Sequence, residues 1–190
     1  LEQKIAENQL QDRITLLKKD YRDLTGQYDK LVSIEMIEAV GHEYLPTFFA
    51  KCNSLLKDSG KMLLQAITIS DSRYDHYRKN VDFIQRYIFP GGCLPSIEVI
   101  GKQFSKQSDM VIDHVQDIGL HYARTLNLWQ QNFNQNWPQL SESGFDNKFK
   151  RLWNYYLSYC EGAFIERAIS THHITARKPK YSSKYDATIL

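Results

Sequence analysis

Hydrophobic residues in the first half of the chain alternate between two spacings, which predict helices and strands in turn. Residues 1–10 have a helical composition, and the β-rich runs 13–18 and 28–34 predict two strands. Apolar residues then recur at helical spacing, at Leu45, Phe48, Phe49, Cys52, Leu55 and Leu56. Residues 58–60 should end this helix, and residues 61–68 form a nearly continuous apolar strand. Strand, helix and strand with short connections predict an α/β fold whose parallel sheet is buried on both faces.

The second half of the chain predicts further elements of the same fold. A helix is expected over 97–107, a strand over 110–120 and a last strand over 169–176, followed by a polar tail over 177–190. Two aromatic-rich helices lie between the last two strands, the first ending at Pro138. Each carries one helical stripe, which favours burial in the core: Leu126, Trp129, Phe133 and Trp137 in the first, and Phe149, Leu152, Trp153, Tyr156, Cys160 and Phe164 in the second.

Residues 71–96 interrupt the alternation of strand and helix. The segment is rich in tyrosine, phenylalanine, lysine and arginine, and it contains the turn sequence Pro90-Gly91-Gly92. Insertions between a strand and the next helix commonly form lids or the walls of binding sites. A solvent-exposed helix and loop is the alternative, and the pattern alone leaves both open.

Composition limits the class of protein. Of the 190 residues, 42% are apolar and 24% are charged, so the chain can build a core and is not a disordered tail. The net charge of +2 argues against a protein that mainly coats nucleic acid. No apolar run approaches the about 20 residues that cross a bilayer. Cys52, Cys93 and Cys160 lack CxxC spacing, which argues against a zinc site or a disulfide framework and favours the reducing cytoplasm.

Polar side chains follow four predicted strands at their carboxyl ends. Because ligands bind at this edge of open α/β sheets, these residues are expected to share one crevice. They are Asp20 and Tyr21, Glu35 and Glu38, Gln65, and Tyr122. Each has an ordinary alternative, since Glu38 could be a charge at a helix N-terminus and Tyr122 a packing residue. Their shared placement favours a functional site.

Other candidate chemistry is weaker. No GxGxxG, P-loop, HExxH or GxSxG motif occurs in the sequence. His42, His76 and the pair His172-His173 lack the spacing of a metal site, so no metal is predicted. Cys93 is expected to be a small buried residue and not a nucleophile.

Six segments, taken in order, resemble the cyclopropane-fatty-acyl-phospholipid synthases. That family includes the mycolic acid cyclopropane synthases and belongs to the S-adenosylmethionine-dependent methyltransferases. The segments are DYRDL at 20–24, YDKLVSIEMIEAVGHE at 28–43, KMLLQAI at 61–67, YIFPGGCLPS at 87–96, GLHYARTLNLW at 119–129 and FKRLWNYYLSYCEGAF at 149–164. The resemblance implies a partial Rossmann-like methyltransferase fold over residues 1–179, with a central, mostly parallel sheet and flanking helices.

The resemblance also bears on the start of the chain. The sequence begins at Leu1 without Met, and its first residues are typical of the middle of a helix. Family members have an earlier strand–glycine loop–helix unit for the methionine part of the cofactor, and a strand that holds the ribose. The resemblance therefore implies a C-terminal part of the enzyme, with the first two strands and a lipid-facing region absent. On this hypothesis the 190 residues alone should bind S-adenosylmethionine weakly.

The family's chemistry transfers a methyl group to a cis double bond of an acyl chain, and the resulting carbocation loses a proton to a bound bicarbonate and closes to a cyclopropane. The resemblance assigns Glu38 and Tyr122 to the bicarbonate site, with a backbone contact at Ile67. The family's histidine position holds Gln65, whose amide can donate a hydrogen bond but cannot titrate. This change weakens the bicarbonate assignment and leaves open whether the product is a ring or a methyl branch.

The remaining roles also follow from the resemblance. Asp20, Tyr21 and Glu35 are expected on the cofactor side, and Tyr87, Phe89, Gly91 and Gly92 on the acyl-chain or lid side. An unsaturated phospholipid is the expected substrate of a cytoplasmic enzyme at the membrane surface, where the basic and aromatic segment 71–96 would face the lipid. Three alternatives stay open: methylation of a small amine, a non-catalytic scaffold, and a homodimer formed through exposed strand edges.

Overall fold

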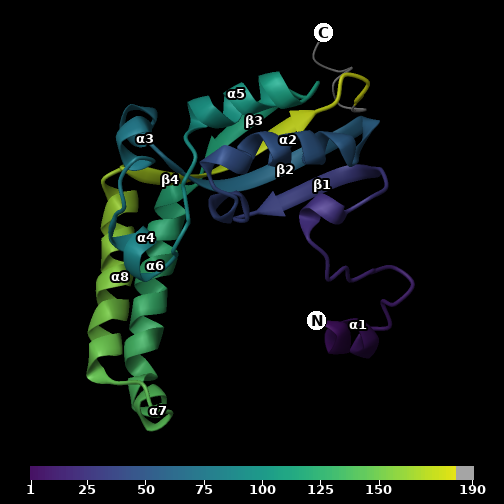
Figure 1. The fold of residues 1–190 in the computed structure, drawn as a ribbon. Coiled ribbons are helices and arrows are strands. Elements are labelled where there is room, and N and C mark those ends of the chain that lie inside the picture. The colour runs from purple at the N-terminus through teal and green to yellow at the C-terminus, as the bar shows by residue number, and fades with distance from the viewer. Residues whose placement is uncertain (183–190) are drawn as a thin grey trace.

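A four-stranded sheet organises the computed structural model, which describes residues 1–182 (Figure 1). The strands are β1 (Tyr28–Ile34), β2 (Leu56–Ile69), β3 (Val111–Asp117) and β4 (Ile169–Arg177), in the order β1-β2-β4-β3. β1 and β2 are parallel, whereas β4 is antiparallel to both β2 and β3. Three strands thus share one direction, and β4 is inserted between two of them. The α/β fold class is confirmed.

Two helices cover one face of the sheet and enclose the main core. α2 (Leu45–Ser54) and α5 (Ile97–Gln107) pack side by side on this face (Figure 1). α2 buries the predicted apolar stripe, and β2 contributes alternate residues to the same core: Met62, Leu64 and Ala66. The intervening residues of β2 are only half-buried. The prediction of a sheet buried on both faces is therefore wrong for the described residues.

The predicted strand over 13–18 does not form. α1 (Glu2–Glu7) confirms the helix within residues 1–10, but residues 13–18 follow it as irregular chain with exposed Ile14, Leu16 and Leu17. β1 is the edge strand of the described sheet, and no strand of residues 1–182 pairs with the segment. Asp20 consequently ends no strand; it caps the short 3-10 helix η1 (Tyr21–Asp23).

Two strand boundaries also differ from the prediction. β2 starts at Leu56, so residues 58–60 lie within the strand and do not end the helix. A register irregularity absorbs them, because Tyr28 pairs with Leu56 while Lys30 pairs with Lys61. β3 ends at Asp117, and residues 119 and 120 already belong to the next helix.

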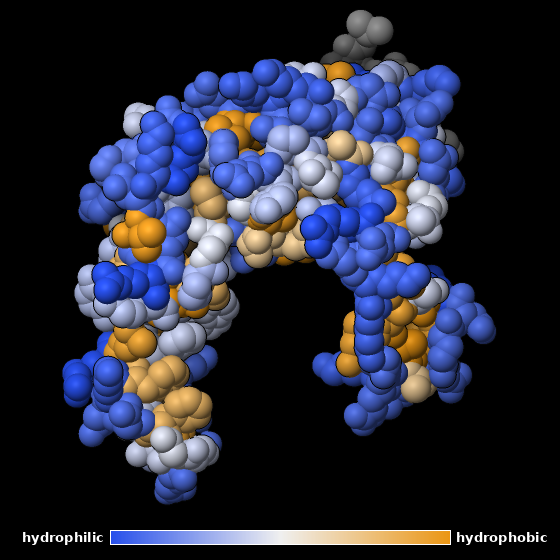
Figure 2. Space-filling view, in the orientation of Figure 1, coloured by the Kyte–Doolittle hydropathy of each residue, from blue (hydrophilic) through white to orange (hydrophobic). Residues whose placement is uncertain are grey.

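A helical hairpin projects from one end of the sheet (Figure 1). It consists of α6 (Gly119–Gln135), α7 (Trp137–Glu142) and α8 (Asn147–Ile165). Its two stripes meet in a second cluster, but only Leu126 and Phe164 of the predicted core positions are fully buried. Trp129 is 48% exposed, and hydrophobic residues show at the hairpin surface in Figure 2. The core prediction holds only near the sheet, because the far half of the hairpin lies beyond it.

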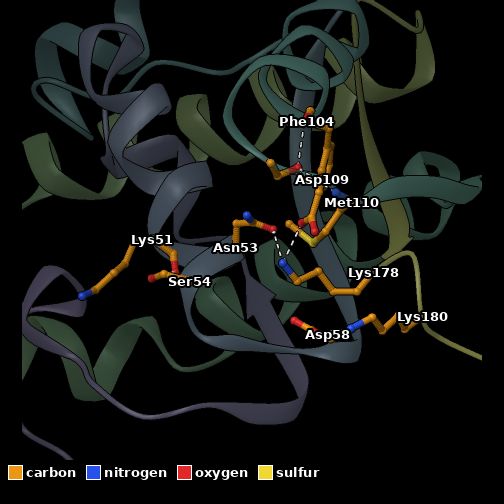
Figure 3. Close-up of polar contacts among 10 residues, drawn as sticks. Lys51, Asn53, Ser54, Asp58, Phe104, Asp109, Met110, Lys178 and Lys180 are labelled. Carbon is orange, nitrogen blue, oxygen red and sulfur yellow. Dashed lines mark hydrogen bonds and ion pairs between the residues drawn. The ribbon is translucent and has the colours of Figure 1, made fainter.

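The chain after β4 is tied to the sheet. Lys178 is buried, and its Nζ donates to Asp109 Oδ1 at 2.6 Å and to Asn53 Oδ1 at 2.9 Å (Figure 3). Lys180 pairs with Asp58 at 2.8 Å but is exposed. The predicted polar tail over 177–190 is thus wrong for Arg177 and Lys178, and residues 183–190 of it lie outside the described residues.

The ion pair of Lys178 predicts an unequal response to two similar substitutions. Asp109→Ala should lower the free energy of unfolding, because the buried ammonium of Lys178 loses its charged partner. Such losses cost about 1–3 kcal/mol, and we expect a value near the lower end because Asp109 is half-exposed and water can replace it. Asp58→Ala is the matched control and should change little, because that pair is exposed. Urea denaturation of the three proteins measures both values. Equal losses of stability in the two variants would contradict a stronger, buried ion pair at Lys178.

Candidate active site

A large cavity of about 1130 Å³ lies where the hairpin meets the sheet. The end of β2, the residues after β1, the start of β4, the hairpin and residues 72–94 all contribute to its lining, with Ile67 from β2 and Tyr122, Leu126 and Phe164 from the hairpin. Most of the surface of this lining is apolar. Glu35, Glu38 and Tyr122 form a polar cluster in this lining, and further polar side chains, such as Arg73 and Asp82, come from segment 71–96.

The inserted segment 71–96 forms one wall of this cavity. It contains the short helices α3 (Asp71–Tyr77) and α4 (Phe83–Tyr87) and then a tight turn. Phe89 O accepts a hydrogen bond from Gly92 N at 3.0 Å, and Gly91 has a φ of +82°, as a type II turn with Pro90 before it requires. Cys93 N donates to Glu38 O at 2.8 Å, so the turn is attached to the polar cluster.

The candidate lid residues divide into two groups. Phe89, Gly91 and Gly92 line the cavity, while Tyr87 does not and is 57% exposed. Cys93 also lines the cavity, and burial raises the pKa of its thiol. A thiol with a raised pKa is a weak nucleophile, as expected, but Cys93 is only partly buried and not fully buried as predicted.

Glu38 is the central acid of the polar cluster. It lies in η2 (Ile37–Ala39), directly after β1, and its Oε1 accepts from the backbone N–H of Ile67 at 2.6 Å. Its Oε2 is buried without a hydrogen-bond partner. Burial raises the pKa of Glu38, and the nearby Glu35 carboxylate adds to this. Glu38 therefore presents an unsatisfied carboxyl oxygen whose protonation is favoured by its surroundings.

Glu35 joins two further candidates. Its Oε2 accepts from the Tyr122 hydroxyl at 2.9 Å, and its Oε1 accepts from Gln65 Nε2 at 2.9 Å. Glu35 takes a left-handed backbone conformation, φ +48°, which is uncommon for a residue with a side chain. The Tyr122 ring stacks on Phe164 at 4.9 Å. Burial, and then the hydrogen bond to Glu35, raise the pKa of Tyr122, so the phenol stays a proton donor.

Asp20 and Tyr21 lie beside a second, smaller hollow of about 400 Å³. Tyr21 packs edge-on against Phe48, and Met36, Val40 and Tyr44 complete the walls. The Asp20 carboxylate is bound by Arg22 at 2.7 Å, which lowers the pKa of Asp20 to about 2. Ala39 lines both spaces, so the hollow and the cavity are neighbours. The structure thus brings Glu35, Glu38, Gln65 and Tyr122 together and leaves Asp20 and Tyr21 next to them.

One participant was missed from sequence. His173 Nε2 lies 2.8 Å from Gln65 Oε1, across the β2–β4 pairing. The spacing of the pair His172-His173 gives no hint of this contact, and residues 1–182 contain no group of three or more His, Cys, Asp or Glu residues that could hold a metal ion. The usable signal was the alternation of strand residues, which puts the two histidines on opposite faces of β4.

The raised pKa of Glu38 predicts how stability depends on pH. The folded state holds the Glu38 proton more tightly than the unfolded state, whose pKa is near 4.5. The contribution of Glu38 to stability is therefore full below this value and declines as the pH rises through the folded pKa, by at most about 1.4 kcal/mol per pH unit. Glu38→Gln removes this decline. Urea denaturation in steps from pH 4.5 to neutrality should show the variant gaining on the wild-type protein, and a constant difference would contradict the burial of an ionisable carboxyl.

The chain matches the mycolic acid cyclopropane synthetase family over residues 1–174. It is 40% identical over 162 residues to tuberculostearic acid methyltransferase UfaA1 of Mycobacterium tuberculosis, covering 85% of this chain and 38% of that protein. It is 38% identical over 170 residues to cyclopropane-fatty-acyl-phospholipid synthase of Escherichia coli, covering 88% of this chain and 42% of that protein. The chain therefore spans less than half the length of these curated relatives.

Solved structures agree with this assignment. Mycolic acid cyclopropane synthase CmaA1, in complex with SAH and CTAB, superposes with a TM-score of 0.75 at 29% identity, covering 85% of this chain and 59% of that one. Cyclopropane synthase MmaA2 from Mycobacterium tuberculosis has a TM-score of 0.76 at 24% identity, with 90% and 65% covered, and supports the fold alone. The chain belongs to the mycolic acid cyclopropane synthetase family of S-adenosylmethionine-dependent methyltransferases.

Proposed function

We propose that the whole protein transfers a methyl group from S-adenosylmethionine to the cis double bond of an unsaturated phospholipid acyl chain, and that the product is a cyclopropane fatty acid. The observation that carries this proposal is a largely apolar cavity of about 1130 Å³ whose lining includes Glu35, Glu38 and the Tyr122 phenol. Methyl transfer to an alkene leaves a carbocation, which water would quench, so the reaction needs an apolar pocket with a base beside it.

The smaller hollow suits the adenine part of the cofactor. S-adenosylmethionine, when bound, supplies an electrophilic methyl group. The half-buried Tyr21 ring and the side chains of Met36 and Val40 offer flat, apolar surfaces for a planar base. Tyr44 closes the hollow, and Ala39 connects it to the cavity. The structure of CmaA1 with SAH supports a cofactor of this class.

The polar cluster suits a bound bicarbonate. Bicarbonate, when bound, supplies the base that takes the proton from the added methyl group as the ring closes. The buried Glu38 Oε2 has no partner and can accept the hydrogen of such an anion. Ile67 and Tyr122 both line the cavity; the Ile67 N–H donates to Glu38 and the Tyr122 hydroxyl to Glu35, so binding of the anion exchanges a carboxylate acceptor for one of its oxygens at each donor. The Gln65 amide is held on Glu35, so it supports this cluster indirectly.

The cavity wall supports work at a membrane surface. Segment 71–96 exposes Val81 at 74% and Tyr87 at 57%, and Arg86 stacks over the Tyr87 ring. Apolar and aromatic side chains beside basic ones favour the interface of an anionic bilayer. No helix within residues 1–182 is long and apolar enough to span a bilayer. We propose a cytoplasmic enzyme that binds the membrane peripherally, and expect it to sediment with anionic but not with neutral vesicles.

Assembly of two copies stays a prediction. β1 pairs on one side only among the described strands, and Val32 and Ile34 are exposed on it. An open strand edge can pair with a second copy or with other parts of the whole protein. Light scattering of the full-length protein distinguishes a dimer from a monomer.

A methyl-branched product is the second candidate. Gln65 replaces the expected histidine, and the relative UfaA1 is named a tuberculostearic acid methyltransferase. The experiment incubates the full-length protein with labelled S-adenosylmethionine and vesicles of cis-unsaturated phospholipid, with saturated phospholipid as the control. Mass spectrometry should show one added CH2 per modified acyl chain, and proton NMR should show the upfield cyclopropane signal. A mass gain on the acyl chain without the cyclopropane signal supports the branched product. A mass gain on the headgroup or on saturated lipid contradicts both the cyclopropane and the branched product.

A further inference from the structure

His173 stands at the end of a directional chain of hydrogen bonds. In the antiparallel pairing of β2 and β4, Gln65 and His173 are direct partners. His173 Nε2 lies 2.8 Å from Gln65 Oε1, and Gln65 Nε2 donates to Glu35 Oε1 at 2.9 Å. The other oxygen of Glu35 accepts from the Tyr122 hydroxyl. Four side chains on four different parts of the chain are thereby linked.

The chemistry of each group fixes the direction of this chain. A carboxamide oxygen only accepts, so the hydrogen between His173 and Gln65 must be on Nε2 of the imidazole. The reverse orientation of the Gln65 amide would direct its oxygen at the Glu35 carboxylate, where two acceptors repel. The Glu35 carboxylate therefore sets the orientation of the Gln65 amide, and His173 supplies the N–H that the amide oxygen accepts in this orientation. Glu35 and Tyr122 line the cavity, whereas Gln65 and His173 lie behind them.

We propose that His173 is a positioning residue of this site: its Nε2–H holds the Gln65 amide oxygen, and the same amide holds Glu35 and, through it, the Tyr122 hydroxyl at the cavity. Position 65 on β2 holds glutamine where the family has histidine, and the residue paired with it on β4 is a histidine, His173. The inference rests on the proposed function for its activity readout, but not for its structural readout.

The structural readout is the tautomer of His173. In ¹⁵N-labelled full-length protein, long-range ¹H–¹⁵N spectra should place a hydrogen on Nε2 of His173, and Gln65→Leu should change the Nε2 chemical shift because it removes the acceptor of that hydrogen. His172 is the internal reference, because its Nδ1 lies 2.9 Å from Thr68 Oγ1 and should not respond. A His173 that carries its hydrogen on Nδ1, or is unchanged by Gln65→Leu, overturns the proposal.

The activity readout compares what replaces the imidazole. His173→Leu should lower kcat about 10–100-fold with little change in the KM for S-adenosylmethionine, as loss of a supporting hydrogen bond does. His173→Gln keeps an amide donor and should recover most of the rate. The double variant Gln65→His with His173→Gln should have a higher kcat than the single variant Gln65→His. The control His114→Gln changes an exposed histidine of β3 and should match the wild-type protein.

These experiments test the role of His173 separately from the proposed methyl transfer. If His173→Gln is as impaired as His173→Leu while both remain folded by urea denaturation, the positioning role is wrong. If both match the wild-type rate, it is also wrong. A wild-type protein that is inactive on every lipid contradicts the proposed function alone, and the tautomer then still decides the role of His173.

Discussion

Glu38→Gln should lower the rate of methyl transfer by about 10²- to 10⁴-fold, the usual range for loss of a positioned acid or base. The variant keeps an oxygen for the Ile67 N–H, whose contact with Glu38 is 2.6 Å long, so the local backbone has no reason to move. It replaces the unpartnered Oε2 by an amide nitrogen, which donates and cannot accept. An anion that must donate its hydrogen at this point then faces a second donor.

The measurement is the initial rate on cis-unsaturated vesicles, together with calorimetric binding of S-adenosylmethionine. Cofactor binding should be nearly unchanged, because Glu38 lines the large cavity and not the hollow beside Tyr21. Glu43→Gln is the matched control, an exposed glutamate five positions further along that lines neither space. Turnover of Glu38→Gln within a few-fold of the control would remove Glu38 from the chemistry.

The elements that sequence predicted well are those whose signal is local. α5, β1 and β4 each carry their own periodicity, and their observed bounds lie within about one residue of the prediction, as does the start of α2. Segment 13–18 carried a similar β-rich pattern, but a strand also needs a hydrogen-bonded neighbour, and none of the described strands lies beside it. Strand propensity alone could not supply that information.

In the candidate site, too, local features were predictable and contacts between distant residues were not. That Glu35, Glu38, Gln65 and Tyr122 would gather was predictable from their places after strands, because strand ends share one edge of a sheet. Which of them touch was not. The contact of Gln65 with His173 joins residues 108 positions apart and depends on β4 entering the sheet between β2 and β3. The alternating pattern of a strand indicates its faces but not its neighbours.

Gly119→Ala should destabilise the protein by about 1–3 kcal/mol, as overpacking commonly does, and lower activity as well. Gly119 begins α6 where the hairpin leaves the sheet, and a Cβ there would lie 2.1 Å from Ser170 Oγ and 3.1 Å from Ser170 Cα. The Ser170 hydroxyl cannot simply turn away, because it donates to Asp117 Oδ1, which also accepts from Gly119 N. The start of α6 must therefore move away from β4.

That movement would reach the active site through Tyr122, one helical turn further along α6. Its hydroxyl lies 2.9 Å from Glu35 Oε2, and small displacements of positioned groups cost up to about 10²-fold in rate, so we expect a loss of about 10- to 100-fold. Thermal denaturation and initial rates measure the two effects. Ser170→Gly in the same protein removes the clashing atoms and should restore part of both.

Gly162→Ala is the control for the glycine-to-alanine change itself. It lies in α8, and no atom would lie within 4 Å of an added Cβ. Alanine should stabilise this helix by about 0.5–1 kcal/mol and leave the rate unchanged. If Gly119→Ala behaves like Gly162→Ala, the close approach of α6 to β4 does not position Tyr122. If Ser170→Gly rescues stability and activity together, one contact sets both the hairpin and the phenol, because the helix that carries Tyr122 is fixed to the sheet at Gly119.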